Sequence, residues 1–574
     1  MKFLYFFIIL FVSVLLYYFL GSYYENETDI FFLVYAKGLL IPKPLALPET
    51  FILQIFIGDA IAFLYTHFPF FEWYDSLTLS FTFFIGAFLF NIFQSLKKFL
   101  YHDAMLRITV LFFFIAIFVS VALLPEITRH SFLIIILVFV VFLLKLLHHQ
   151  KISTLFFISC YLAFLVSCLR RPEPAIALTF LFTAFLLLLF FEGRVDMNRA
   201  VKIILPCLFI LFFLYVYTHV PRTPEGHRYL GIVPYENTLV DFKGELSDVR
   251  LLTKTDTIKY LAASHFFFTD TKHLNQVFFQ KIGIVPLDKS PGYFFKYITR
   301  LPIVKDRAIK LVNDICRNEN GLFLLLVVIN ILWPFYSRKR SPKSILGKLL
   351  FSGVFWGTFL FANLFMKVET KVNESLLLFL IVMLLVCLID PQLTRISKRL
   401  SFVVSTAIIV CVLWRGLGFF QLYQIKKNDA GYMDKVRATI NDFTNSLVVL
   451  NISCWDNISI RLFDNDTYNP NNTYISFDNG VLYIFDEYNS YMKRVTGSLE
   501  FIDQVDYVAR QPNARWFSSE KRMKMIVNYI NAVYRKNYSY TLLKAIERDE
   551  NSDYNTQAIG IYKINEKGLF KLKN

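Results

Sequence analysis

The chain has 574 residues, is 56% hydrophobic and contains 64 Phe. This apolar content exceeds the roughly 45–50% of ordinary globular domains. Much of it lies in continuous runs of about 20 residues, long enough to cross a membrane as helix. The formal net charge of +16 suggests a nucleic-acid partner only if the basic residues cluster on a water-exposed domain. Composition therefore predicts an α-helical polytopic membrane protein and excludes an ordinary soluble enzyme.

About eleven apolar runs are predicted to span the membrane as helices. The first, 3–20, follows Lys2 and is not followed by a small-residue cleavage site, so we expect a retained anchor. We expect a multi-pass protein of the plasma (inner) membrane, with a cytoplasmic N-terminus. The other predicted spans are 77–96, 108–124, 131–147, 152–169, 175–192, 203–219, 321–336, 346–366, 375–391 and 401–418.

Basic residues concentrate in the five loops predicted to face the cytoplasm. These loops hold sixteen Lys/Arg and two acids, whereas the four shorter outer segments hold seven basic and eleven acidic residues. The positive-inside bias and the attraction of anionic lipid explain this asymmetry. The net charge therefore reflects topology, and no nucleic-acid partner is expected. The five basic loops are 97–107, 145–151, 193–202, 337–348 and 392–399.

Two domains are predicted. Residues 1–418 form a membrane-embedded helical domain with large outer loops at 21–76 and 220–320. Residues 419–574 form an extracytoplasmic (periplasmic) soluble α/β domain that is nearly neutral, with twenty Lys/Arg and eighteen Asp/Glu, and is large enough for a core of its own. Within it we expect helices at 431–443 and 520–534, and strands at 446–452, 474–477, 481–485 and 559–563.

Three carboxylates, Glu25, Glu27 and Asp29, follow the first predicted span. They are either a solvated acidic loop or part of a site. The apolar run 30–34 follows Asp29 directly and would draw it toward a partly desolvated interface, where a carboxylate's pKa rises and it can act as a general base. The interrupted apolar stretch 51–74 then predicts helices lying on the outer leaflet, with an aromatic belt at its end.

A second candidate is the turn Arg170-Arg171-Pro172-Glu173-Pro174. Pro in a first turn starts a helix, and a helix N-terminus beside two arginines suits a phosphate group. The alternative is a tight turn whose arginines reach lipid headgroups. Arginines on an outer turn run against the positive-inside bias, which favours a function. Asp241, in the 220–320 loop, is a further acidic candidate.

This pattern resembles the GT-C superfamily of integral membrane glycosyltransferases, whose members place a catalytic acid in the first outer loop. Asp29 stands at that point here. Later in the same loop the sequence has Gly58-Asp59, Leu64-Tyr65 and a Pro69…Trp73-Tyr74 run. Glu27-Thr28-Asp29 occupies the place where similar bacterial multispanning proteins read Asn-Asp-Asp, so the first acid of that pair is absent.

The resemblance implies an inverting hexosyl- or pentosyl-transferase that moves a sugar from a polyprenyl-phosphate donor to a glycan, lipid or protein acceptor outside the cell. It implies that Asp29 is catalytic and that Arg170 and Arg171 bind phosphate. The remaining acids, which could contact acceptor or support Asp29, are Glu27, Asp59, Glu173 and Asp241. The sequence identifies no certain cofactor and has no CxxC or Cys/His metal spacing, and a divalent metal would be compatible with the acidic residues.

Two other functions stay open at this stage. One is a lipid-linked glycan polymerase, ligase or flippase that shares the lipid-phosphate site. The other is a non-catalytic membrane anchor whose outer domain binds a partner. A secondary transporter is disfavoured because ionisable residues lie at the ends of the predicted spans and not at their centres.

Overall fold

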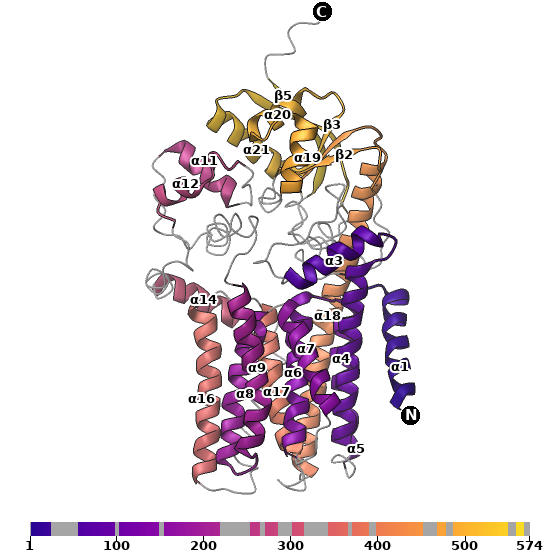
Figure 1. Ribbon diagram of the computed structural model, residues 1–574, viewed down its shortest axis with the longest axis vertical. Helices are drawn as coiled ribbons and strands as arrows, with labels where there is room; N and C mark the ends of the chain where they lie inside the picture. The colour runs from indigo at the N-terminus through magenta and orange to yellow at the C-terminus, as the bar shows by residue number, and fades with distance from the viewer. Residues whose placement is uncertain are drawn as a thin grey trace, which may run out of the picture.

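A computed structural model gives the fold as a helical bundle with a small sheet domain at one end (Figure 1). We call the end of the bundle nearest the sheet domain its domain end, and the opposite end its far end. The residues that the structure describes are 2–23, 55–97, 103–147, 154–170, 172–218, 253–264, 270–284, 301–314, 342–365, 370–389, 398–451, 468–477, 486–548 and 558–566.

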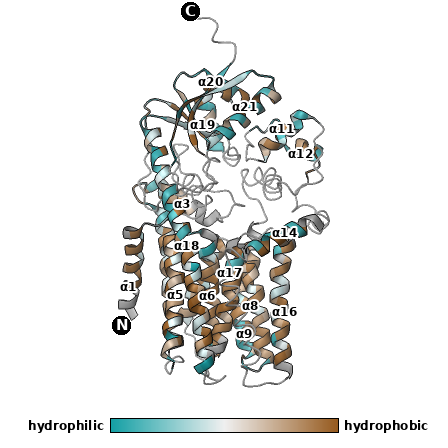
Figure 2. Cartoon of the chain, turned by 180° about the vertical axis from the view of Figure 1, so that it is seen from behind, coloured by the Kyte–Doolittle hydropathy of each residue, from teal (hydrophilic) through white to brown (hydrophobic). Residues whose placement is uncertain are grey.

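The bundle contains helices at ten of the eleven predicted spans, and the span 321–336 lies outside the described residues. Within the described part of the chain, five helices are long and apolar enough to cross a membrane: α4, α5, α6, α9 and α18. Four shorter apolar helices lie among them, and the brown colouring of Figure 2 runs through the whole bundle. The bounds are α1 Lys2–Leu15 continued by the π-helix η1 Leu16–Leu20, α4 Trp73–Lys97, α5 Ala104–Leu123, α6 Ile127–Leu147, α7 Thr154–Arg170, α8 Pro172–Phe191, α9 Met197–Thr218, α16 Pro342–Phe365, α17 Thr370–Ile389 and α18 Lys398–Asn441.

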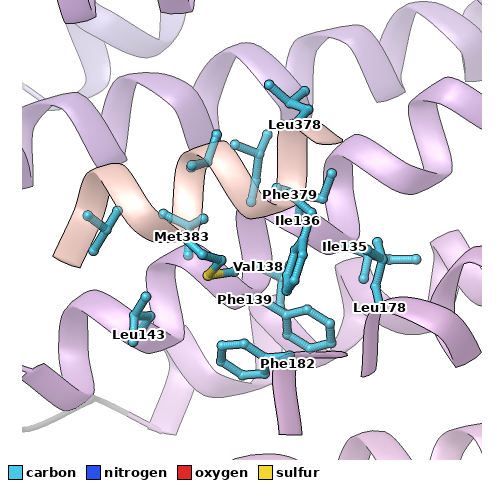
Figure 3. Close-up of a cluster of buried hydrophobic side chains, with 14 of the residues drawn as sticks. Ile135, Ile136, Val138, Phe139, Leu143, Leu178, Phe182, Leu378, Phe379 and Met383 are labelled. Atoms are coloured by element: carbon cyan, nitrogen blue, oxygen red, sulfur yellow. The ribbon is translucent and has the colours of Figure 1, made fainter. Parts of the chain in front are cut away.

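Helix α6 is the centre of this bundle. It packs against α4, α7, α8 and α17, and no side chain between Phe132 and Leu144 is more than 5% exposed. Figure 3 shows Phe139 of α6 stacked on Phe182 of α8, with ring centroids 4.4 Å apart, and Met383 of α17 beside them. Because α6 is apolar on all faces, it has to be surrounded by other helices or by lipid. Other helices surround it here.

The helix ends that the predicted basic loops join all lie at the far end of the bundle (Figure 1). Lys348 of α16 and Glu192, just after α8, also meet there, with Nζ and Oε1 3.5 Å apart and both side chains almost fully buried. The clustering of basic residues at one end follows the predicted pattern, and the side of the membrane that this end faces stays a prediction.

Helix α1 packs along α4, and Gly86 of α4 makes that approach close. A Cβ atom at Gly86 would lie 2.8 Å from Ile9 Cγ2 of α1 and 2.7 Å from Phe118 Cε2 of α5. Gly86→Ala is therefore expected to cost about 1–3 kcal/mol of unfolding free energy, because both neighbours must shift. Thermal unfolding in detergent measures this cost.

Gly353→Ala is the matched control for that experiment. A Cβ at Gly353 of α16 meets nothing within 4 Å, so the change should be neutral or should stabilise by up to about 1 kcal/mol. Equal effects of the two substitutions would contradict the close packing of α1, α4 and α5.

Helix α18 joins the two parts of the protein without a break. It was predicted as a span, 401–418, and a separate helix, 431–443, but it runs continuously from Lys398 to Asn441. Its last turns enter the sheet domain, where Tyr432, Val436 and Ile440 are fully buried. The helix therefore belongs to both the bundle and the domain (Figure 1).

The sheet domain has five strands in the order β2-β1-β3-β5-β4. Strand β1 is parallel to β2 and β3, whereas β5 is antiparallel to β3 and β4. The predicted α/β class is confirmed, as are the helix 520–534 and the terminal strand. The bounds are β1 Leu447–Leu450, β2 Thr473–Ile475, α19 Asp486–Thr496, α20 Phe501–Arg510, β3 Ala514–Ser519, α21 Glu520–Tyr534, β4 Tyr538–Ala545 and β5 Ile559–Glu566.

Part of the loop 220–320 docks on this domain. Helices α11 (Lys254–Ala263) and α12 (Gln276–Lys281) lie beside the sheet domain (Figure 1), and α11 packs on α21. Asp270 lies in the chain between α11 and α12. Its carboxylate accepts hydrogen bonds from the hydroxyls of Tyr529 and Tyr534 of α21, each at 2.6 Å. A further helix, α14 (Leu301–Asp314), packs on α16 at the domain end of the bundle.

Candidate functional site at the domain end

A cavity of about 230 Å³ lies between α5, α6, α17 and α18 at the domain end of the bundle. Most of its wall is apolar. Three charged side chains, Arg129 of α6, Glu374 of α17 and Arg415 of α18, also line it. The remaining lining residues are Phe113, Ala116, Ile117, Val119, Ser120, Leu133, Ser375, Leu378, Cys411, Val412, Gly416 and Phe419.

The three charged residues form one ion-paired group. Arg129 Nη2 lies 3.4 Å from Glu374 Oε2, and the Arg415 guanidinium pairs with the other oxygen, Oε1. The exposed fractions of the side chains are 12% for Arg129, 19% for Glu374 and 28% for Arg415. The group therefore connects three helices at a point that is largely removed from water.

Helix α6 begins at this group because Glu126 caps it. The Glu126 Oε2 atom accepts the backbone N–H of Arg129 at 2.5 Å. A carboxylate at a helix N-terminus satisfies an N–H that has no partner within the helix and offsets the positive end of the helix dipole. This cap fixes the first turn, and therefore the position of Arg129.

A buried chain of polar side chains runs beside this group. The hydroxyls of Tyr17 in η1 and Thr82 in α4 are hydrogen-bonded, with their oxygens 2.9 Å apart. The Thr82 hydroxyl is also hydrogen-bonded to Nε2 of His130 in α6, at 3.1 Å. Polar side chains inside a bundle bond across helices because lipid offers no other partner. The chain links the end of the first helix to the residue next to Arg129.

The start of the loop 21–76 is anchored next to the cavity. Ser22 Oγ donates to the Ala122 carbonyl at 2.6 Å, and the Tyr23 N–H donates to the Leu123 carbonyl at 3.0 Å. The hydroxyl of Tyr423 in α18 donates to the Leu20 carbonyl. Gly21 has φ +77°, in the left-handed region that glycine tolerates, so the chain can turn sharply into this anchor.

The end of the same loop is helix α3 (Ile55–His67), which crosses the domain end of the bundle (Figure 1). It packs on α4 and α7, and the Tyr65 hydroxyl accepts the backbone N–H of Tyr74 at 3.1 Å. Burial is the main cause that raises the pKa of Tyr65, and the Asp75 and Glu72 carboxylates raise it further. Tyr65 is therefore neutral at physiological pH.

The predicted aromatic belt follows α3. Phe68, Phe70 and Phe71 are 44%, 84% and 44% exposed, and Trp73 Nε1 donates to the Phe68 carbonyl at 2.9 Å. Exposed aromatic side chains at the boundary between an apolar bundle and a polar domain are typical of a membrane interface. The position of α3 agrees with the predicted helix on the membrane surface.

Four of the predicted site residues lie outside the described residues: Glu27, Asp29, Arg171 and Asp241. The other three are described by their backbone alone. Arg170 is the last residue of α7, Glu173 is the second residue of α8 and Asp59 lies within α3. Because α3 packs on α7, the structure associates the segment that carries Asp59 with the helix that leads to Arg170.

The group of Arg129, Glu374 and Arg415 was not predicted as a site. Arg415 lies inside the predicted span 401–418 and Glu374 directly precedes another span, so their charge in apolar surroundings was the available signal. Among the described residues, no three His, Cys, Asp or Glu side chains gather in a way that could hold a metal ion.

These observations define a multi-pass α-helical membrane protein with an α/β domain at one end. No family model and no curated protein matches the sequence. Two similar solved structures are those of ArnT from Cupriavidus metallidurans, in the apo state and bound to undecaprenyl phosphate. Each is 12% identical in sequence; the TM-scores are 0.37 and 0.35, over 97% and 98% of this chain and 96% and 97% of the other.

TM-scores of this size assign no function to the chain. The functional proposal therefore has to rest on this chain's own residues.

Proposed function

We propose that this protein is a GT-C-like glycosyltransferase that moves a sugar from a polyprenyl-phosphate donor to an acceptor on the outer face of the membrane. The observation that carries the proposal is the anchoring of both ends of the loop 21–76 at the domain end of the bundle. Tyr23 is held against α5 by its hydrogen bond to Leu123 and against α18 by its ring contact with Tyr423. Helix α3 lies on α7, which ends at Arg170.

This anchoring limits where Asp29 can lie. It lies six positions after Tyr23 in the sequence, an extended reach of at most about 22 Å. This reach is compatible with the proposal that Asp29 acts near the membrane boundary, where a lipid-linked sugar would present its phosphate. Helix α7 ends at Arg170 and α8 begins at Pro172, at the domain end of the bundle, which supports the proposal of a site shared by a base and a phosphate cradle.

In the proposed reaction, Asp29 accepts the proton of an acceptor hydroxyl as its oxygen bonds to the anomeric carbon of the sugar. The bond from that carbon to the donor phosphate breaks, and the lipid phosphate leaves with the bonding electrons. Arg170, Arg171 and the backbone N–H of Glu173 stabilise the developing charge; Pro172 and Pro174, in the same turn of α8, have no N–H to donate. Glu27, Asp59, Glu173 and Asp241 are proposed to contact acceptor or to support Asp29.

Arg171→Ala tests the phosphate cradle. We expect turnover of a polyprenyl-phosphate-linked sugar by purified protein in lipid to fall about 10–100-fold, because one charge-assisted hydrogen bond to the leaving phosphate is lost. Arg199→Ala is the matched control, since that side chain is 51% exposed at the far end of the bundle. Its turnover should equal that of wild type.

The same assay decides between this proposal and its rivals. If wild-type protein neither binds nor consumes such donors, the transferase proposal is wrong, and the sheet domain becomes the part to test for partner binding. If Arg171→Ala keeps full turnover, the phosphate is bound elsewhere.

A further inference from the structure

The first helix leaves the bundle through a turn of four residues, 20–23, which we call the anchor turn. The helix ends as the π-helix η1 at Leu20, and the last turn of a helix leaves carbonyl groups that have no partner within it. Tyr423 of α18 supplies a partner, because its hydroxyl donates to the Leu20 carbonyl and lies 3.3 Å from the Gly21 carbonyl. Tyr423 therefore caps the first helix from a position 403 residues later in the sequence.

The anchor turn in its own right caps helix α5. Ser22 Oγ donates to the Ala122 carbonyl at 2.6 Å, and the Tyr23 N–H donates to the Leu123 carbonyl at 3.0 Å. Ala122 and Leu123 are the last two residues of α5, so their carbonyls also lack a partner within their helix. The turn thus joins the ends of two helices to the side of a third, α18.

Apolar side chains enclose these hydrogen bonds. Tyr23, Leu123, Leu124 and Tyr423 are each at most 8% exposed and form one buried cluster with Ala430 of α18. The rings of Tyr23 and Tyr423 meet edge to face, with their centroids 5.6 Å apart. Breaking a hydrogen bond in such a place leaves a buried group unpaired, which is costly, so we expect the anchor turn to keep one conformation.

The π-helix that leads into the anchor turn is fixed as well. Its Tyr17 hydroxyl is hydrogen-bonded to Thr82 of α4 at 2.9 Å, and both side chains are buried. π-helical turns are rare and occur frequently at functional sites. The end of the first helix is therefore placed by contacts with α4, α5 and α18 together.

We propose that Tyr423 is a positioning residue for the loop 21–76, because its cap fixes the point and the direction in which the chain leaves the bundle toward Asp29. The inference rests on the proposed role of Asp29 as the base. A misplacement of about 1 Å in a catalytic group can cost roughly 10²-fold in rate. Since α18 continues into the sheet domain, the helix that carries this domain would also set the geometry of the site, without contacting the substrate.

Tyr423→Phe removes the capping hydroxyl and keeps the ring. We expect the kcat of sugar transfer to fall about 10–100-fold, with KM for the lipid-linked donor unchanged, because Arg170 and Arg171 are proposed to bind the donor. Ser22→Ala breaks a separate hydrogen bond of the same turn and should give the same result, a lower kcat at constant KM. Agreement between the two variants would assign the effect to the turn and not to α18 alone.

Tyr161→Phe is the matched control. The Tyr161 hydroxyl of α7 lies 3.3 Å from the Lys202 carbonyl and 3.1 Å from the Ile203 carbonyl, both of α9, and donates to them. The substitution therefore removes the same kind of bond between two helices, from a hydroxyl to backbone carbonyls. Tyr161→Phe and Tyr423→Phe should lower the Tm by similar amounts, but Tyr161→Phe should keep the wild-type kcat.

Hydrogen exchange of the full chain tests the anchor turn without any reaction. Amides of residues 20–23 should exchange faster in Tyr423→Phe and as in wild type in Tyr161→Phe; unchanged exchange in both would overturn the inference. It is also wrong if exchange rises in Tyr423→Phe while kcat stays at the wild-type value and Asp29→Asn is inactive. Full activity of Asp29→Asn would instead overturn the proposed base, and with it the catalytic part of the inference.

Discussion

Asp29→Asn is expected to reduce sugar transfer by roughly 10²–10⁴-fold, the range that a positioned general base contributes. The amide keeps the size and hydrogen-bonding shape of the side chain but cannot accept the acceptor's proton. Donor binding should be little changed, because the base acts on the acceptor. The measurement is single-turnover transfer from a polyprenyl-phosphate-linked sugar in lipid, with donor affinity measured on the same preparation.

Glu25→Gln is the matched control, because Glu25 belongs to the same acidic cluster and lies closer to the anchored Tyr23. Its activity should stay within about twofold of wild type, as for a surface substitution outside a site. If Asp29→Asn folds and transfers sugar at the wild-type rate, Asp29 is not the base. Loss of activity in Glu27→Gln instead would move that role to Glu27.

Asp270→Ala is expected to detach the α11–α12 segment from the sheet domain. The Asp270 side chain is buried and accepts 2.6 Å hydrogen bonds from Tyr529 and Tyr534. Burial, and after it the Asp270 carboxylate, raise the pKa of both tyrosines, so they remain protonated donors. Removing the carboxylate leaves two hydroxyls in a poorly hydrated place, and we expect a loss of about 3–5 kcal/mol.

Hydrogen exchange of the full chain measures this loss directly. Backbone amides of α11, α12 and α21 should exchange faster in Asp270→Ala, whereas those of α6 and α17 should not change. Asp270→Asn should lose less, since the amide oxygen still accepts a hydrogen bond. Asp196→Ala, half-exposed at the far end, should be neutral within about 0.5 kcal/mol. Unchanged exchange in α11 would show that other contacts hold this segment.

The helices of the bundle could be predicted from the sequence because each apolar run is long enough to span the membrane and is bounded by charged or turn residues. The helix 520–534 was likewise predicted with both ends correct, since Ser519 caps it by accepting the Arg522 N–H and its apolar residues repeat at helical spacing. Both signals are local. They need no knowledge of what the segment packs against.

The features that were missed depend on distant contacts. Strand β3 reads Ala-Arg-Trp-Phe-Ser-Ser and is buried along almost its whole length, so no alternation marks it as a strand. The pairing of Arg129 with Glu374 joins residues 245 positions apart, and Arg415 stands alone in an apolar stretch of sequence. Their meeting is decided by the packing of α6, α17 and α18, which no local pattern records.

Because α18 is one continuous helix, movement at one of its ends is transmitted to the other. Its 44 residues span about 66 Å at 1.5 Å per residue. Arg415 lies near its midpoint, beside the cavity, and Tyr432 and Val436 are clamped in the sheet domain. A tilt of a few degrees about the bundle would displace the domain by several ångströms over the membrane surface. Movement of this helix inside the bilayer would then be carried to the domain above it, because the helix is unbroken between them.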